Sequence, residues 1–154
     1  MSEWTPIFTV IAGIPVALFT SWVTVKFALR RFQSEKWFER RVEAYTRVIE
    51  SLHHMKSTTE RQIRAVERGV DIPEDTEKEL VESYRKSLAD LRRLTDMGAL
   101  VFSSDAITVL ERLNNDLEAA TNEQSWWEHL DAEAGAILKC LSEIRAIAKR
   151  DLNA

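Results

Sequence analysis

Residues 34–55 read SEKWFERRVEAYTRVIESLHHM, and apolar side chains recur in this stretch at steps of three and four residues. Such spacing is typical of an amphipathic α-helix, which collects its apolar side chains on one face. The helical pattern continues to Arg68, after which Gly69 and the segment VDIP end it. The stretch therefore predicts a helix over 34–68 that packs one face against other helices. The predicted apolar face consists of Phe38, Val42, Tyr45, Ile49 and Leu52.

Two further segments with helical periodicity follow. Thr76 and Glu79 form a capping-box pair that predicts the start of a second helix, and Gly98 predicts its end as a left-handed cap. A third helix is predicted to begin at Ser104 or Asp105. The predicted apolar faces of these two helices are Leu80, Tyr84, Leu88 and Leu91, and Ile107, Leu110, Leu113 and Leu117.

A fourth helix is predicted after Ser125, which forms a second capping-box pair with Glu128. No segment shows sustained strand alternation, and the apolar run ALVF at 99–102 is too short to found a sheet. Short connections make neighbouring helices antiparallel, so residues 35–154 predict an all-α, antiparallel bundle of about four helices. The predicted apolar face of the fourth helix is Trp127, Leu130, Ala134, Ile137, Leu141, Ile144 and Ala148.

The stretch before this bundle has a different composition. Residues 7–25 read IFTVIAGIPVALFTSWVTV, nineteen residues without a charge in a chain that is 30% charged as a whole. A helix of this length spans roughly 28 Å, close to the hydrocarbon thickness of a bilayer. A removed signal peptide would show a basic start and a small-x-small cleavage site, and neither is present. We therefore expect a short external N-terminus at 1–6 and a transmembrane helix at 7–28.

Basic residues follow the apolar stretch, and none precedes it. Because lysine and arginine are retained on the cytoplasmic side, the sequence predicts a single-pass protein of the cell inner membrane with its N-terminus outside and its C-terminal domain in the cytoplasm. Residues 29–41 form a basic and aromatic juxtamembrane segment. The side chains expected to contact lipid headgroups are Lys26, Arg30, Arg31, Lys36, Arg40 and Arg41.

One face of the predicted transmembrane helix carries only small and weakly polar side chains. Such a face lets two helices approach closely in lipid, so the sequence predicts a homo-oligomer associated through this helix. The predicted association face is Thr9, Gly13, Ala17, Thr20 and Thr24.

The sequence contains no recognisable catalytic or metal site. With four glycines in all, the chain cannot build a glycine-rich phosphate loop or a dinucleotide-binding fingerprint. Glu50 and His53 have the spacing used in di-iron bundles, but no second Glu-x-x-His motif exists, so an exposed polar flank is the better reading. Cys140, the only cysteine, is expected to be a small buried hydrophobe. No cofactor is predicted.

The segments KWFERRVEAYTRVIESLHHM, GALVFSSDAI and KCLSEIRAIAKRDL resemble a group of small, uncharacterised bacterial proteins. Members of this group have one N-terminal transmembrane helix and a cytoplasmic helical domain. The resemblance covers nearly the whole chain and carries no catalytic motif. It therefore implies an architecture and a bacterial origin, but no activity.

Together these observations predict a membrane-anchored, non-enzymatic helical adaptor whose partners are the lipid bilayer, a second copy and an unidentified protein. Only one ring of the adjacent pair Trp126 and Trp127 can point fully inward, which makes Trp126 the candidate partner contact. No concentrated basic stripe suggests nucleic-acid binding. One alternative is a membrane-perturbing effector, of a phage-defence or toxin-like kind, that acts by clustering its transmembrane helices. The other is an enzyme with an unrecognised site.

Overall fold

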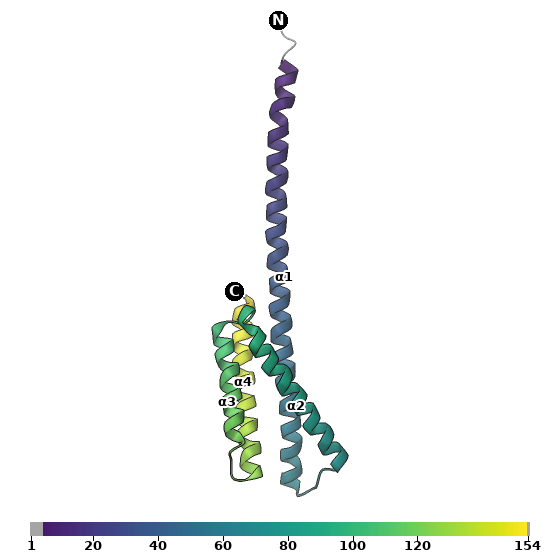
Figure 1. The fold of residues 1–154 in the computed structure, drawn as a ribbon, viewed down its shortest axis with the longest axis vertical. Coiled ribbons are helices and arrows are strands. Elements are labelled where there is room, and N and C mark those ends of the chain that lie inside the picture. Colours follow the sequence, from purple (N-terminus) through teal and green to yellow (C-terminus); the bar gives the residue numbers. More distant parts are fainter. Residues whose placement is uncertain (1–4, 154) are drawn as a thin grey trace. The chain divides into compact units, whose positions relative to one another are not determined.

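The computed structural model describes the backbone of residues 5–153 and the side chains of Lys26, 35–98 and 100–153. The chain divides into two compact units, Met1–Glu39 and Arg40–Ala154. The elements are α1 (Thr5–Arg68), α2 (Glu74–Met97), the short 3-10 helix η1 (Gly98–Leu100), α3 (Ser104–Ala120) and α4 (Trp126–Asn153). No strand occurs between residues 5 and 153, so the predicted all-α class is confirmed (Figure 1).

The predicted membrane-spanning segment at 7–28 lies in α1, which contributes to both units. Among the residues whose side chains are described, no helix is long and apolar enough to cross a bilayer. Apart from Lys26, the side chains of 7–28 lie outside the described residues. The transmembrane helix therefore stays a prediction.

One narrow row of buried side chains, the seam of α1, contributes to the core of the second unit. Tyr45, Val48, Leu52 and Met55 are all at most 1% exposed and follow at steps of three and four residues. The seam differs from the predicted face, because Phe38 is 51% exposed and Val42 and Ile49 are only half-buried. A period of 3.5 residues keeps this seam turned toward its partner helices.

The helices α3 and α4 lie side by side along their length and run antiparallel (Figure 1). The buried faces of the two helices contain most of the residues that the sequence predicted for them. Beside these faces, the Arg112 guanidinium donates two hydrogen bonds, of 2.9 and 3.2 Å, to the Glu143 carboxylate. The prediction that Trp127 packs inward is wrong, since its side chain is 43% exposed. Leu130, one turn later, is fully buried, so the seam of α4 begins there. The buried residues that were predicted on these two helices are Leu110, Leu113, Leu117, Leu130, Ile137, Leu141, Ile144 and Ala148.

Several helix ends agree with the capping signals. Gly69 has a φ of 61°, and the Val70 amide donates to the Ala65 carbonyl at 3.1 Å, as in a Schellman motif. The Ser125 hydroxyl accepts a hydrogen bond from the Glu128 amide at 3.1 Å, which confirms the start of α4. α3 begins at Ser104, as predicted, with its N-terminus capped from the preceding residue.

Two predicted caps are wrong. α2 begins at Glu74 rather than Thr76, and Pro73 occupies its N-cap position without a side-chain hydrogen bond. Instead, the first turn carries the acidic residues Glu74, Asp75 and Glu77, whose negative charges interact favourably with the positive end of the helix dipole. Gly98 has a right-handed conformation with a φ of −72°, so it is not a left-handed cap. The Phe102 ring packs against Gly98 and leaves no space for a side chain at this position.

Candidate functional site

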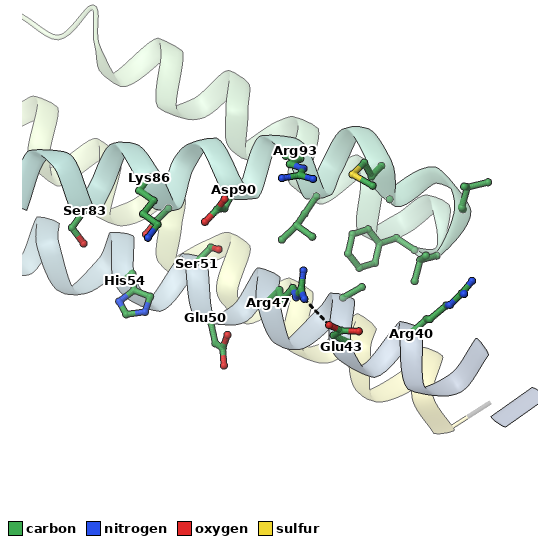
Figure 2. A pocket seen from close by; sticks show the side chains of 18 residues that line it. Arg40, Glu43, Arg47, Glu50, Ser51, His54, Ser83, Lys86, Asp90 and Arg93 are labelled. Atoms are coloured by element: carbon green, nitrogen blue, oxygen red, sulfur yellow. Dashed lines mark hydrogen bonds and ion pairs between the residues drawn. The ribbon is translucent and has the colours of Figure 1, made fainter. Parts of the chain in front are cut away.

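A groove of about 890 Å³ lies between α1 and α2 in the second unit (Figure 2). Its volume falls within the range of pockets that bind small molecules. In Figure 2 the side chains of Ser51, Lys86 and Asp90 lie between the two helices. The groove is therefore a candidate binding site built by two helices that the sequence already placed in one bundle.

Apolar side chains gather at one end of the groove, where Arg40 and Arg93 also lie (Figure 2). Leu94, Val101 and Phe102 line it, and the Phe102 ring meets the Tyr45 ring at a centroid distance of 5.0 Å with an interplanar angle of 54°. Met97 and Leu100 belong to the same end and are 61% and 81% exposed. Exposed apolar side chains next to a groove are typical of a surface that binds another molecule.

Two serines line the groove from opposite helices. Ser51 of α1 is 9% exposed and Ser87 of α2 is 8% exposed. Within the described part of the chain, neither hydroxyl makes a hydrogen bond. By contrast, the buried hydroxyl of Thr95 donates to the Leu91 carbonyl one turn earlier, at 2.9 Å. Among the described side chains, the only buried polar atom without a partner is Asn114 Oδ1, so the two serine hydroxyls are open to the groove.

Charged side chains of both signs line the groove. Four of them are basic and three are acidic. Arg47 and Glu43 neutralise each other through an ion pair of 2.6 Å. The charged residues that line the groove are Arg40, Arg47, Lys86, Arg93, Glu43, Glu50 and Asp90.

A separate polar cluster is buried where α1, α2 and α4 meet. Thr59 donates a hydrogen bond of 2.5 Å to the carboxylate of Glu133, whose side chain is one of the few buried charged groups. His129 places its Nε2 atom 3.6 Å from the other oxygen of Glu133. Burial raises the pKa of Tyr84, and the nearby Glu133 carboxylate raises it further. The cluster links the helices through polar contacts rather than apolar packing.

His129 also joins α4 to the end of α3. Its Nδ1 atom lies 2.8 Å from the carbonyl oxygen of Ala120, and this atom must carry the proton, because a carbonyl can only accept. The Trp126 ring stacks on the imidazole at a centroid distance of 5.1 Å with an interplanar angle of 23°. The Trp126 side chain is nevertheless 57% exposed. The indole is thus held in place while most of it faces solvent.

A third polar contact joins α1 to the last turn of α4. The Tyr45 hydroxyl donates to the Asp151 carboxylate at 2.6 Å. Burial tends to raise the pKa of Asp151, but hydrogen bonds from Ser103, Tyr45 and Arg150 outweigh it and hold the pKa below its ordinary value. This contact joins the first and last helices of the bundle and serves stability.

The residues predicted for membrane contact fall mostly outside the described side chains. This holds for the association face Thr9, Gly13, Ala17, Thr20 and Thr24 and for Arg30 and Arg31. The remaining basic residues, Lys26, Lys36, Arg40 and Arg41, are exposed. Lys36 forms an ion pair with Glu39 at 2.7 Å. The headgroup contacts and the association face stay predictions.

The predicted nature of three further residues is confirmed. Glu50 and His53 are exposed, and the His53 Nε2 atom accepts a hydrogen bond of 2.6 Å from Arg145. Cys140 is 3% exposed, and burial, which is the largest cause, raises the pKa of its thiol to about 12. Such a thiol is unreactive near neutral pH. In the described part of the chain, no group of three or more acidic, histidine or cysteine side chains could hold a metal ion.

Comparisons with known proteins add no family. No family model matches the chain, and neither a curated protein nor a solved structure is significantly similar to it.

Proposed function

We propose that the chain is a single-pass membrane protein whose helical domain binds another protein and catalyses no reaction. The anchor is the uncharged stretch at 7–25, and the domain follows it on the cytoplasmic side. The observation that carries the binding function is the Trp126 indole. A large aromatic ring that is exposed yet fixed by stacking is a pre-organised contact, because it loses little conformational freedom when a partner covers it.

A photocrosslinking experiment tests the binding function. A photoreactive amino acid placed at position 126 in the full chain is expected to crosslink a specific protein in bacterial membranes. The control is the same substitution at Leu138, which lies on the same helix and is 47% exposed. If both positions capture the same proteins in equal amounts, Trp126 is not a specific contact and the proposed function fails.

The proposed orientation predicts the behaviour of fusion proteins. A reporter that is active only in the cytoplasm, fused after Ala154, is expected to work, whereas one that is active only outside is expected to fail. Moving Arg30, Arg31 and Lys36 to the front of the apolar stretch removes the charge bias, so it should weaken or invert this result. An external C-terminus in the wild-type chain would show that the orientation is wrong.

The predicted association face is tested by paired substitutions in the anchor. Gly13→Ile is expected to weaken self-association in a membrane two-hybrid assay, because a bulky side chain holds the two backbones apart. Leu18→Ile changes the opposite face, so it should leave self-association unchanged. Equal signals from both variants would remove the anchor as the site of assembly. Growth arrest and loss of membrane potential on overexpression would instead favour the membrane-perturbing effector.

A further inference from the structure

We propose that the surface around Trp126 binds a segment of a partner protein that is rich in arginine or lysine. This names the class of partner and therefore rests on the proposed function. Three features of the surface support it, which are its exposed apolar side chains, its negative charge and the open face of the indole.

Apolar side chains of α1 and α4 come together at this surface. The two helices run antiparallel, and Thr59 of α1 donates a hydrogen bond to Glu133 of α4. Val66 lies roughly two turns beyond Thr59 on the same side of α1. Trp126 lies roughly two turns before Glu133 on the same side of α4, so it reaches the level of Val66. Both side chains face solvent there, as does Trp127, with exposed fractions of 43% for Val66, 57% for Trp126 and 43% for Trp127.

The hairpin of α3 and α4 that carries the indole is acidic. Residues 113–138 contain six acidic residues and no lysine or arginine. Four of the six carboxylates are exposed, and none of these four forms an ion pair within the part of the chain that the structure describes. A negative surface attracts partners of the opposite charge. The four exposed acidic residues are Glu118, Glu123, Glu128 and Asp131.

The arginines at the end of α1 do not neutralise this surface. At about 100° per residue, Val66 lies about 20° from Thr59 around the helix axis, whereas Arg61, Arg64 and Arg68 lie about 140–180° from it. Because Thr59 faces α4, the three arginines lie on the opposite side of α1. All three are exposed.

The Trp126 ring has one face free for a cation. Its other face stacks on the His129 imidazole at a centroid distance of 5.1 Å, so the exposed part of the indole includes the face that points away from the imidazole. Arginine and lysine cations are attracted to the face of an indole, and arginine can also stack on it. The aliphatic part of such a side chain can cover Val66 while its charged end reaches the carboxylates.

The test uses the full chain in nanodiscs of zwitterionic lipid, so that lipid charge does not attract the probe. The probe is a short fluorescein-labelled peptide in which arginine alternates with leucine. A matched peptide carries citrulline, which is uncharged, in place of every arginine, and nanodiscs without protein give the background. By fluorescence anisotropy, the arginine peptide is expected to bind about tenfold more tightly than the citrulline peptide, and more weakly as salt is added. Equal binding of the two peptides, or no binding of the arginine peptide, would overturn the proposal.

Variants locate the binding surface. Trp126→Leu keeps an apolar side chain but removes the indole face, so it should weaken binding about fivefold. The double variant Glu123→Gln, Glu128→Gln should weaken it about tenfold. The matched control is Asp96→Asn, Glu111→Gln, which removes two exposed negative charges outside 113–138 and should leave the affinity nearly unchanged. Circular dichroism checks that each variant retains the wild-type helix content. Equal weakening by the two double variants would overturn the proposal, because the attraction would then come from the overall charge of the chain.

Photocrosslinking at position 126 distinguishes this proposal from the proposed function. A specific crosslinked protein together with equal affinities for the two peptides would retain the binding function and overturn only the cationic class of partner. Equal capture of proteins from positions 126 and 138 would remove the binding function itself.

Discussion

Gly98→Ala is expected to lower the free energy of unfolding by about 2–4 kcal/mol, because the added methyl group collides with a buried aromatic ring. A Cβ atom at this position would lie 2.2 Å from Cδ2 and 2.7 Å from Cε2 of Phe102. The ring cannot withdraw as a unit, since the Phe102 amide donates to the Gly98 carbonyl at 2.7 Å. Rotating the ring away would break its contact with Tyr45.

The measurement is urea unfolding of the full chain in detergent, followed by near-ultraviolet circular dichroism. Gly135→Ala is the matched control, because Gly135 lies on the exposed face of α4 and its added Cβ meets no atom within 4 Å. Replacing glycine by alanine inside a helix reduces the freedom of the unfolded chain, so this variant should gain about 0.5–1 kcal/mol. A Gly98→Ala variant as stable as the wild type would show that the ring does not occupy this position.

Gly98 illustrates which structural features can be predicted from the sequence. The end of α1 at Gly69 and the start of α4 after Ser125 depend on residues within one turn, and both predictions are confirmed. The ring that packs on Gly98 is close in sequence, but its contact with Tyr45 depends on how a distant helix docks. A glycine after an apolar periodic segment predicts a left-handed cap. This rule correctly placed the end of α2 at Gly98, but it predicted the wrong backbone conformation, because the glycine is needed there to make room for Phe102.

The buried polar residues were missed for a different reason. The predicted faces follow apolar residues only, and in the fourth helix they pass through Ala134, whereas the true seam runs through Leu130, Glu133, Ile137 and Cys140. In α1 the seam likewise continues from Met55 to Thr59. The sequence did contain a signal for these buried polar residues, because they keep the 3.5-residue spacing of their apolar neighbours.

The groove between α1 and α2 was not predictable from the same signals. Ser51 and Ser87 are ordinary polar residues in helical segments, and their burial depends on the crossing of two helices. No local pattern sets the distance between two helices that cross, since it results from all the side chains packed between them. The sequence predicted which helices exist but could not predict the space between them.

Glu133→Ala is expected to lower the free energy of unfolding by about 1–3 kcal/mol, because it removes the acceptor of the short hydrogen bond from Thr59 and leaves a buried space where the side chain was. Thr59 donates to this carboxylate at 2.5 Å, and His129 lies 3.6 Å from it. Thr59 is fully buried, so after the substitution only the Met55 carbonyl, at the longer distance of 3.1 Å, is left to accept its proton. Asp131→Ala is the control on the same helix, and it should change stability by less than about 0.5 kcal/mol because Asp131 is exposed.

A double-mutant cycle shows whether the loss arises from the hydrogen bond or from packing alone. Thr59→Val keeps the shape of the side chain and removes the donor, so on its own it should also destabilise the protein. Once Thr59 is valine, Glu133→Ala no longer removes a hydrogen bond between the two side chains, and its cost should fall by about 1 kcal/mol. Both measurements use urea unfolding of the full chain in detergent at constant pH. Strictly additive losses would mean that Thr59 and Glu133 contribute independently, and that the polar cluster does not couple α1 to α4.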